Sequence, residues 1–563
     1  MAQEETGVLV VGGGPTGLTA ARLLAGYGVP VVLAERHPGT AIHPRARGLN
    51  VRTMEVFRTL GLEEVVRRAG AALAASRYVL VVETLAGPEL RRVPDPDLLP
   101  LGERLDRFTP CDWCQCAQDE LEPILAQAAR AAGADLRFGT ELEAFTQEAE
   151  GVTARLVDAT GGRHTVRARY LIGADGADSM VRSALGITMA EGHGFDPLGH
   201  YLNIYFRADL TDLVRDRLFG VCYVEHPAAE GVLLPVNNRD RWLFNIPYDP
   251  ARGQSPADFP AARCTALVRQ AIGRPDLPVE ILSVLPWEAA ARVSERFQVG
   301  RVFLAGDAAH LTPPAGAFGL NTGVQDAHNL SWKLAAVWGG TAGVGLAATY
   351  EAERAPVARL AVGVTMQALD TPAPDAGAAA HAGAALPPEH ADPLSARLLP
   401  ILGYRYASTA VGPDLAAGAA PPPGVPDLTG RPGTRVPHRW LRYTGIRLST
   451  IDVCDGDWVL LAGPDGIAWR TAAEQAAAAL GLTLHAYRIM PAAEGAVALD
   501  DVLDLVEDRA VGDEQRGWAV TAGIGPAGAL LVRPDGYVAW RAPAAAAATS
   551  AALTGVLHGL LGQ

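Results

Sequence analysis

Three glycines near the start of the chain have the spacing of a phosphate-binding turn. Gly12, Gly14 and Gly17 form a G-x-G-x-x-G pattern directly after the apolar run 7–11, which is typical of a buried parallel strand. In such a turn the first glycine permits a tight bend, the second admits a pyrophosphate, and the third lets a helix pack on the strand. The helix that follows attracts phosphate through its N-terminal amides and dipole. The residues predicted to contact the phosphates are Gly12, Gly14, Pro15, Thr16 and Gly17.

A carboxylate ends the next apolar run of the chain. Glu35 follows residues 30–34, which predict a second strand of the same βαβ unit. A carboxylate in this position can accept hydrogen bonds from both hydroxyls of a ribose. We expect Glu35 and its neighbour Arg36 to contact the adenosine half of a dinucleotide. This pattern explains adenine-dinucleotide binding, but it does not choose between FAD and NAD.

Composition limits the classes of protein that this chain can belong to. It has 563 residues, 49% of them hydrophobic, which predicts a globular protein of about three domains. The net charge of −14 argues against nucleic acid or an anionic membrane as a partner. Residues 1–6 are polar and no apolar run is long enough to span a membrane, so we expect no signal peptide and a cytoplasmic location.

Neither cysteine nor lysine chemistry is indicated. Cys111, Cys114 and Cys116 resemble half of a metal site, but no second pair of ligands follows, so no metal is expected. Reduced thiols are the default in the cytosol. Lys333 is the only lysine among 48 basic residues, which leaves almost no lysine for catalysis.

The pattern of strands and helices predicts four regions. Residues 1–190 and 286–370 are expected to form a discontinuous dinucleotide-binding domain, with a short insertion near 78–105. Residues 191–285 contain aromatic-rich strand candidates that suggest an antiparallel substrate-binding sheet. Residues 371–437 are a Pro/Ala/Gly-rich linker with a small helical segment. In residues 438–563 the order βαβ then ββα is thioredoxin-like, but no CxxC is present, so redox exchange there is not expected.

With its motifs in this order, the chain resembles the FAD-dependent aromatic hydroxylases of the para-hydroxybenzoate hydroxylase type. Within them it is similar to the three-domain phenol, dichlorophenol and aromatic polyketide hydroxylases. Besides the glycine turn, the resemblance rests on Gly173-Ala174-Asp175-Gly176 and on Gly306-Asp307, and it covers the whole length. It implies an α/β fold with a Rossmann-like, glutathione-reductase-like FAD/NAD(P)-binding domain, an antiparallel substrate-binding sheet and a C-terminal thioredoxin-like domain.

The resemblance also assigns cofactor contacts. Asp307 can accept hydrogen bonds from the ribityl hydroxyls of a flavin. Pro314 forms a rigid bend beside the flavin ring, and the helix that follows directs its positive end at the pyrimidine edge. Asp175 would support the pyrophosphate loop and NAD(P)H interaction, or simply cap a turn. The other contacts carried over from the family are Arg45, Gln118, Gly319, Leu320 and Asn321; Arg47 could equally face solvent.

The chemistry implied by the resemblance is aromatic hydroxylation. NADPH or NADH would reduce noncovalent FAD transiently, and O2 would form a C4a-hydroperoxide that attacks an electron-rich phenolic or polyketide-like ring. Baeyer–Villiger oxygenation and a redox-silent flavin-binding protein stay open as alternatives. A halogenase is disfavoured, because Phe244 stands where a W-x-W-x-I-P motif has its second tryptophan. A simple NAD dehydrogenase would leave Gly306-Asp307 unexplained.

Substrate contacts are less determined by the sequence than cofactor contacts. The expected antiparallel wall carries four polar or aromatic candidates, which core packing would explain equally well: Tyr201, Asn203, Tyr205 and Tyr223. Pro314 and Tyr223 are the candidates for a catalytic role. Beyond the aromatic substrate and O2, no macromolecular partner is indicated, and a homo-oligomer is an open alternative to a monomer.

Overall fold

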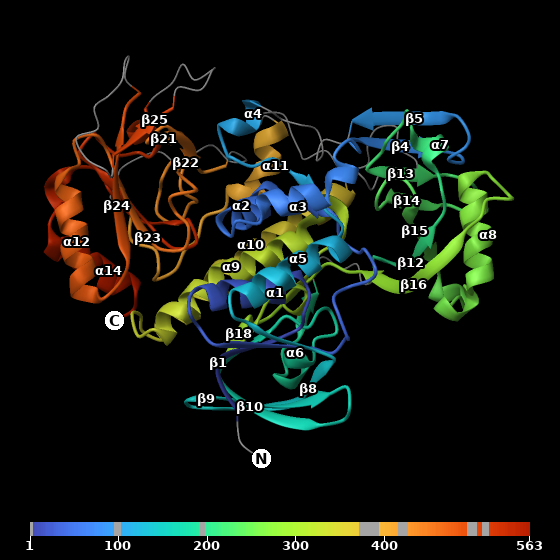
Figure 1. The fold of residues 1–563 in the computed structure, drawn as a ribbon, viewed down its shortest axis with the longest axis horizontal. Helices are drawn as coiled ribbons and strands as arrows, with labels where there is room; N and C mark the ends of the chain where they lie inside the picture. Colours follow the sequence, from blue (N-terminus) through green and yellow to red (C-terminus); the bar gives the residue numbers. More distant parts are fainter. Residues whose placement is uncertain are drawn as a thin grey trace.

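A mixed α/β architecture organises the described part of the chain (Figure 1). The computed structural model describes residues 4–94, 103–191, 198–370, 393–414, 426–492, 504–508 and 517–563. Within these residues, three sheets of seven or eight strands dominate the topology. In Figure 1 the C-terminal sheet lies on the left, the sheet of β12–β16 on the right, and a stack of helices between them.

The first sheet contains the glycine turn. Its strand order is β18-β19-β10-β1-β2-β7. Strands β8 and β9 form a hairpin, and β9 also pairs antiparallel with β10. The strands β19, β10, β1, β2 and β7 run parallel, as expected for apolar strands buried on both faces. Its strands are β1 (Glu4–Val11), β2 (Val31–Glu35), β7 (Asp135–Phe138), β8 (Thr140–Glu148), β9 (Gly151–Asp158), β10 (Arg163–Gly173), β18 (Gln298–Val299) and β19 (Val302–Leu304).

Four long helices pack beside this sheet in the middle of the molecule (Figure 1). They are α1 (Pro15–Gly26), α5 (Gln118–Ala131), α9 (Phe318–Trp338) and α10 (Gly345–Asp370). The helix expected from about Asn321 begins three residues earlier, at Phe318, and most of its side chains are buried. The sequence predicts an amphipathic helix over 118–132 with Leu121, Ile124, Leu125 and Ala128 on one face; in α5, Leu121 and Leu125 are buried, whereas Ile124 and Ala128 are only half-buried. Helices α1 and α9 contact each other closely, which brings two distant motifs together.

The second large sheet differs from the predicted region 191–285. Its order is β16-β12-β15-β14-β13-β4-β5, antiparallel except for the parallel pair β13 and β4. Residues 78–94, expected as an insertion in the dinucleotide-binding domain, instead supply β4 and β5 to this edge. The sheet comprises β4 (Tyr78–Val82), β5 (Glu89–Pro94), β12 (Gly199–Arg207), β13 (Val221–Val224), β14 (Gly231–Pro235), β15 (Arg241–Tyr248) and β16 (Glu280–Ala289). Helix α8 (Ala261–Ile272) and the short α7 (Thr211–Val214) contribute to the apolar core on one of its faces.

The C-terminal sheet contains the predicted order of elements. Strand β23, helix α12 (Ala468–Leu480) and β24 are followed by β26, β27 and α14 (Ser550–Leu560), and α12 packs against α14. The full strand order is β22-β21-β25-β24-β23-β26-β27. Its strands are β21 (Trp440–Tyr443), β22 (Ile446–Ser449), β23 (Trp458–Ala462), β24 (Leu484–Met490), β25 (Asp504–Glu507), β26 (Ala529–Val532) and β27 (Val538–Ala542).

Smaller elements connect the sheets. Of the expected linker, residues 371–392 and 415–425 lie outside the described residues. The helical segment of the linker is α11 (Pro393–Leu402). The other short elements are β3 (Gly48–Leu49), α2 (Val51–Thr59), α3 (Glu63–Ala69), α4 (Glu103–Asp106), β6 (Cys114–Gln115), α6 (Met180–Ala184), β11 (Met189–Glu191), β17 (Arg292–Ser294), β20 (His310–Leu311) and α13 (Trp518–Thr521).

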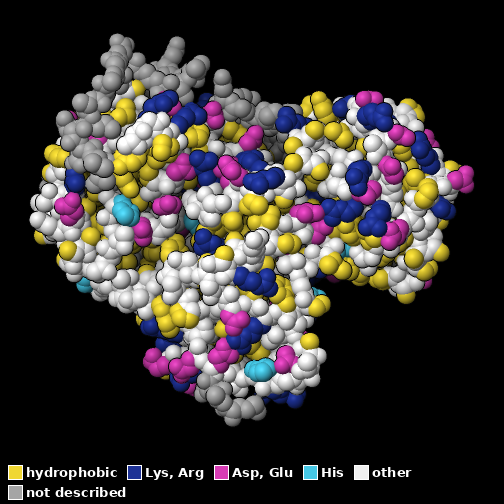
Figure 2. All heavy atoms as spheres, viewed as in Figure 1, with side chains coloured by type: hydrophobic (Ala, Val, Ile, Leu, Met, Phe, Trp, Pro, Cys, Tyr) yellow, Lys and Arg dark blue, Asp and Glu magenta, His cyan; other side chains and the backbone are white. Residues whose placement is uncertain are grey.

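The surface carries both signs of charge. On the face shown in Figure 2, Lys and Arg side chains are interspersed with Asp and Glu side chains. Among the helices that the structure describes, none has the length and apolar character needed to cross a bilayer.

Candidate active site

The three glycines of the N-terminal turn occupy three different environments. Gly12 has a φ of +108°, and a Cβ added there would lie 2.2 Å from the carbonyl oxygen of Ala174. A Cβ on Gly17 would lie 2.0 Å from the carbonyl oxygen of Gly12. A Cβ on Gly14, in contrast, would meet no atom within 4 Å. Gly12 and Gly17 are therefore required by the protein's own packing, whereas Gly14 borders open space at the start of α1.

Thr16 joins the first glycine motif to the third motif. A Cβ on Gly306 would lie 2.6 Å from Thr16 Oγ1, and a Cβ on Gly323 of α9 would lie 2.2 Å from the same atom. Both glycines thus make room for one side chain of α1. Because Pro15 and Thr16 begin α1, whose first turn has no side-chain cap, the free amides of this helix lie next to the Gly306 turn. Segments nearly three hundred residues apart in the sequence therefore form one site.

Glu35 reaches back to the glycine turn. Its Oε2 accepts a hydrogen bond from the Gly13 amide at 2.6 Å, and its Oε1 accepts one from the His37 amide at 2.8 Å. The carboxylate therefore lies where the first strand–turn–helix unit and the second strand meet, as the sequence predicted. Its neighbour Arg36 is exposed.

Asp307 lies beside the first turn of α9. The nearest atom to a Cβ added at Gly319 is Asp307 Oδ1, at 3.9 Å. Surrounding protein raises the pKa of the Asp307 carboxyl by desolvation, while His310 and Arg45 act in the opposite direction. The side chain is nevertheless exposed, as expected for a group that borders an open space inside the fold.

The turn before α9 has an unusual backbone. Gly316 and Ala317 have φ values of +78° and +53°, so both lie in the left-handed region, and no side chain caps the helix. The first helical amides lack intrahelical acceptors and remain free for a ligand. Pro314, just before this turn, is exposed, whereas Leu320 is half-buried against the main core. This arrangement costs backbone strain at Ala317, which is typical of functional sites.

Asn321 has a structural task that the sequence did not reveal. Its Oδ1 accepts a hydrogen bond from the Asn50 amide at 2.9 Å, and its Nδ2 donates to the carbonyls of Gly48 and Ala317 at 2.9 and 2.6 Å. The side chain is fully buried and holds the strained turn against the segment that precedes α2. These contacts occupy its side-chain amide, so any ligand contact would come from the backbone of this segment.

The loop after β2 is pinned on both sides. The Ala41 amide donates to Glu122 Oε2 at 2.5 Å, and Gln118 Nε2 donates to Glu122 Oε1 at 2.6 Å. Arg47 does not face solvent freely: its guanidinium donates to the carbonyls of Pro235 and Gly220 at 2.8 and 2.9 Å, which joins the loop to the second sheet. Arg45, between these anchors, is exposed.

Asp175 supports the start of the short helix α6, whose N-cap residue is Ser179. Its carboxylate accepts hydrogen bonds from the Ser179 hydroxyl at 2.6 Å and from the Val181 amide at 3.0 Å. Within the protein, these contacts of Asp175 agree with the alternative that it stabilises a turn.

The second sheet presents alternate side chains of β12 to opposite faces. Leu202, Ile204 and Phe206 belong to the core that α8 covers. Tyr201, Asn203 and Tyr205 therefore lie on the other face, as strand periodicity requires. Tyr201 stacks on Trp287 with ring centroids 4.8 Å apart.

A histidine missed by the sequence analysis lies against this face. His43, from the pinned loop, has its Nδ1 2.6 Å from Ser283 Oγ, and its ring packs edge-on against Tyr205 at 5.6 Å. Burial lowers the pKa of His43 to about 4, a shift that the nearby Asn203 opposes. His43 Nε2 and Asn203 Oδ1 are both buried and make no hydrogen bond of normal geometry, although Asn203 lies close enough to His43 to oppose the lowering of its pKa. Buried polar atoms without a hydrogen bond of normal geometry mark a place where a ligand could supply one.

Tyr223 has a different environment. It is buried in a small apolar cluster with Val79 and Val81 of β4. The strand register places it on the same face of the sheet as Asn203, and its catalytic role stays a prediction.

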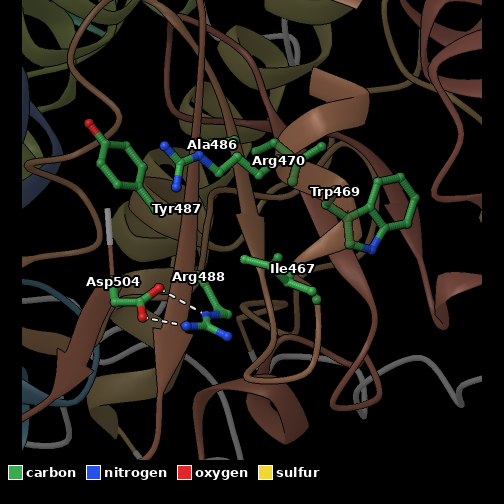
Figure 3. Close-up of a pocket in the computed structure, with 10 residues that line it drawn as sticks. Ile467, Trp469, Arg470, Ala486, Tyr487, Arg488 and Asp504 are labelled. Carbon is green, nitrogen blue, oxygen red and sulfur yellow. Dashed lines mark hydrogen bonds and ion pairs between the residues drawn. The ribbon is translucent and has the colours of Figure 1, made fainter. Parts of the chain in front are cut away.

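Further ionisable groups lie on the cysteines and in the described part of the C-terminal sheet. All six cysteines are free and buried, and burial raises the pKa of the Cys454 thiol. Among the described residues, no cluster of His, Cys, Asp and Glu could hold a metal. A hollow of about 20 Å³ on the C-terminal sheet has room for little more than one water. Figure 3 shows Arg488 and Asp504 pointing toward each other there, joined by contacts of 2.9 and 2.5 Å.

Comparison with known proteins agrees with this geometry. Residues 5–365 match the family described as FAD binding domain, and residues 429–563 match aromatic-ring hydroxylase, C-terminal. A putative polyketide hydroxylase of Streptomyces halstedii is 44% identical, over 98% of this chain and 97% of its own length. A tetracenomycin A2 monooxygenase-dioxygenase of Streptomyces glaucescens is 42% identical, over 96% of this chain and 94% of its own.

A solved structure extends the comparison to three dimensions. The ternary complex of aklavinone-11 hydroxylase with FAD and aklavinone has a TM-score of 0.83 and 38% identity, with both chains covered completely. The fold and the site therefore define a flavoprotein whose FAD-binding part carries an aromatic-ring hydroxylase C-terminal region. The chain belongs to the family of FAD-dependent aromatic hydroxylases, and FAD is its cofactor.

The residues present fit FAD. The free space at Gly14 and the uncapped starts of α1 and α9 suit the pyrophosphate and the flavin ring, and Asp307 suits the ribityl chain. Glu35 suits the adenosine ribose.

Proposed function

We propose that this chain is an NAD(P)H-driven monooxygenase that hydroxylates a phenolic aromatic polyketide. The observation that carries the proposal is the pair of His43, on the loop after β2, and Asn203, on an aromatic wall of β12: His43 Nε2 and Asn203 Oδ1 are buried without a hydrogen bond of normal geometry. Substrate recognition in the relatives supports the same class, since aklavinone-11 hydroxylase is seen with aklavinone. Bound FAD supplies electron transfer from the nicotinamide and activation of O2.

The protein's own residues would bind and orient the ring. The Ser283 hydroxyl can donate to His43 Nδ1, which leaves the ring proton on Nε2. With substrate bound, Nε2 would donate to a carbonyl oxygen of the substrate in place of its contact with Asn203, and Asn203 Oδ1 would accept from a phenol hydroxyl. Tyr201 and Tyr205 supply flat apolar surface on either side of Asn203. A hydroxylated, carbonyl-bearing aromatic system matches this set of donor, acceptor and wall.

We propose the following division of labour among the regions. The parallel sheet, within 1–190 and 286–370, would be the Rossmann-like FAD-binding domain. The second sheet, 191–285 with β4 and β5 added, would bind substrate. The region 438–563 would be a thioredoxin-like domain attached through the linker 371–437. Supporting observations are the sheet memberships and the order of elements.

Halide chemistry has little support in this site. Lys333 donates to Glu353 at 2.7 Å and to Asn329 at 2.9 Å, and its side chain is fully buried. As the only lysine of the sequence, it leaves none for a halogenase-type role.

The proposed reaction is tested by oxygen labelling. With NADPH or NADH and 18O2, we expect one labelled oxygen on an aromatic carbon of an anthraquinone- or naphthacenequinone-type phenol. Substrate should also accelerate flavin reduction and suppress peroxide release, because hydroxylation requires that bound substrate exclude water from the reacting flavin. A labelled lactone or ester would instead indicate Baeyer–Villiger oxygenation. Nicotinamide oxidation without an oxygenated product from any phenol would indicate an oxidase. The absence of nicotinamide oxidation would indicate a redox-silent flavoprotein.

The polar pair on the sheet gives a second test. Replacing Asn203 by alanine should weaken substrate binding about tenfold, because a buried hydrogen bond to the ligand is lost. Ser283→Ala should have a smaller effect in the same direction, since it only frees the His43 ring. Titration of the flavin spectrum with substrate measures both, with Ser255→Ala, an exposed serine after β15, as the control. Unchanged substrate affinity in Asn203→Ala would remove this residue from the site.

A further inference from the structure

A buried carboxylate holds the turn that carries Asp307. Asp326, on α9, accepts a hydrogen bond from the Gly306 amide at 3.0 Å, and its Oδ2 lies 2.7 Å from His310 Nε2. Its other oxygen accepts from Arg354 Nε at 2.7 Å. The side chains of Asp326, His310 and Arg354 are all fully buried. Asp326 thus contacts both ends of the segment 306–310, at Gly306 and at His310.

Arg354 is in turn fixed by two tyrosines that follow α11. Its Nη1 donates to the hydroxyls of Tyr404 and Tyr406 at 3.3 and 3.1 Å. The ring of Tyr406 packs on Tyr537 with centroids 4.3 Å apart. Tyr537 follows the hairpin turn between β26 and β27 of the C-terminal sheet. The chain of contacts therefore runs from the C-terminal sheet to Asp326 without a solvent gap.

A second set of contacts fixes the same hairpin to α10. Arg533 donates to both oxygens of Glu353, at 2.6 and 2.9 Å, and pairs with Asp535. Glu353 is the neighbour of Arg354 on α10. Arg52 of α2 donates to the Asp535 carbonyl at 2.7 Å. Besides the tyrosine contacts, the β26–β27 hairpin is therefore held by Arg533 against α10 and by Arg52 against α2.

Such a network restricts geometry more than it adds stability. Buried ion pairs gain little over well-packed apolar residues, but removing one partner leaves an uncompensated charge. The end of this network is a main-chain amide of the flavin-binding turn, where small displacements change ligand contacts.

We infer that Asp326 is a positioning residue for FAD, and that the C-terminal region, through Tyr537, Tyr406 and Arg354, holds Asp326 in place. The C-terminal region would then set how firmly the flavin is retained, without contacting it. The inference rests on the proposed contact between the Gly306-Asp307 turn and FAD.

The test compares FAD release from full-length holoenzymes. Asp326→Asn should accelerate release about tenfold, and Tyr406→Phe, which keeps the ring packing, about threefold. The double variant should fall short of the product of the single effects, because both substitutions act through one chain of contacts. The visible circular dichroism of bound flavin should change in Asp326→Asn. Cys454→Ser, buried in the same C-terminal region but outside these contacts, is the control and should match the parent.

The outcomes separate this inference from the proposed function. If the parent chain binds no FAD, the proposed function itself fails. If the parent binds FAD and the folded Asp326→Asn variant releases it at the parental rate, with an unchanged flavin spectrum, Asp326 has only a structural role. Multiplicative effects in the double variant would overturn the link between Tyr406 and Asp326. Tyr406→Phe removes only one hydroxyl, so FAD release can still be compared with the parent if Asp326→Asn does not fold.

Discussion

Replacing Gly14 by valine is expected to abolish FAD retention and to leave the fold intact. No protein atom lies within 4 Å of a Cβ at this position, and its backbone does not require glycine. The added side chain would instead fill the space next to the start of α1 that a pyrophosphate needs. We expect at least about a 100-fold loss of FAD affinity, or roughly 2.8 kcal/mol. Flavin content after purification and reconstitution of the apoprotein measure this loss.

Two further variants show whether the loss is specific. Gly345→Val, at the exposed start of α10, adds the same side chain in open space and should retain FAD. Gly17→Ala should lower the melting temperature of the apoprotein as well as flavin content, because its Cβ would lie 2.0 Å from the Gly12 carbonyl. A Gly14→Val protein that purifies yellow with the parental flavin content would refute the position of the pyrophosphate.

The parts of the fold that the sequence predicted are those with local signals. The strand that ends at Val11, the turn at Gly12 and the helix α5 each depend on neighbouring residues, and the structure contains them with small shifts. The short apolar runs Trp458–Ala462 and Ala529–Val532 each lie between turn residues and predict strands, and β23 and β26 have these same bounds. Helix α9 begins before its predicted start because a left-handed Ala317 replaces the polar cap that usually marks a helix start.

The errors come from long-range pairing. Strand β5 has mostly exposed, charged residues, so nothing in residues 89–94 indicates a strand that pairs with β4. The parallel pairing of β4 with β13 joins segments about 140 residues apart, and no local pattern encodes such a partner. The second sheet was therefore predicted too short at this edge.

The same reason limits prediction of the site. The glycine turn and Asp307 have short motifs, whereas the contact of His43 with Ser283 spans 240 positions. One signal was available: an otherwise apolar face on β12 carries Asn203, and a buried amide requires a partner. Asn321 stands in a predicted cofactor-binding segment, yet its side chain serves the backbone of Gly48, which only the tertiary structure reveals.

Removing the carboxylate of Asp307 is expected to weaken FAD binding about 10- to 100-fold, the range for hydrogen bonds to a charged group. Asp307→Ala should show the full loss, and Asp307→Asn a smaller one, because the amide oxygen still accepts a hydrogen bond. Desolvation by the surrounding protein raises the pKa of this carboxyl, so it takes up a proton at a higher pH than an ordinary aspartate. Since only the ionised form is a full acceptor, FAD affinity of the parent should fall as the solution is acidified through that raised pKa.

The pH dependence separates a direct contact from a packing effect. In Asp307→Asn the carboxyl is absent, so FAD affinity should lose this acidic decline while staying below the parental value at neutral pH. Fluorescence titration of apoprotein with FAD across the acidic range measures both curves, and the circular dichroism of the apoprotein verifies folding at each pH. Parallel curves for the parent and Asp307→Asn would assign the decline to another group. Equal affinity in all three proteins at neutral pH would mean that the ribityl chain is held elsewhere.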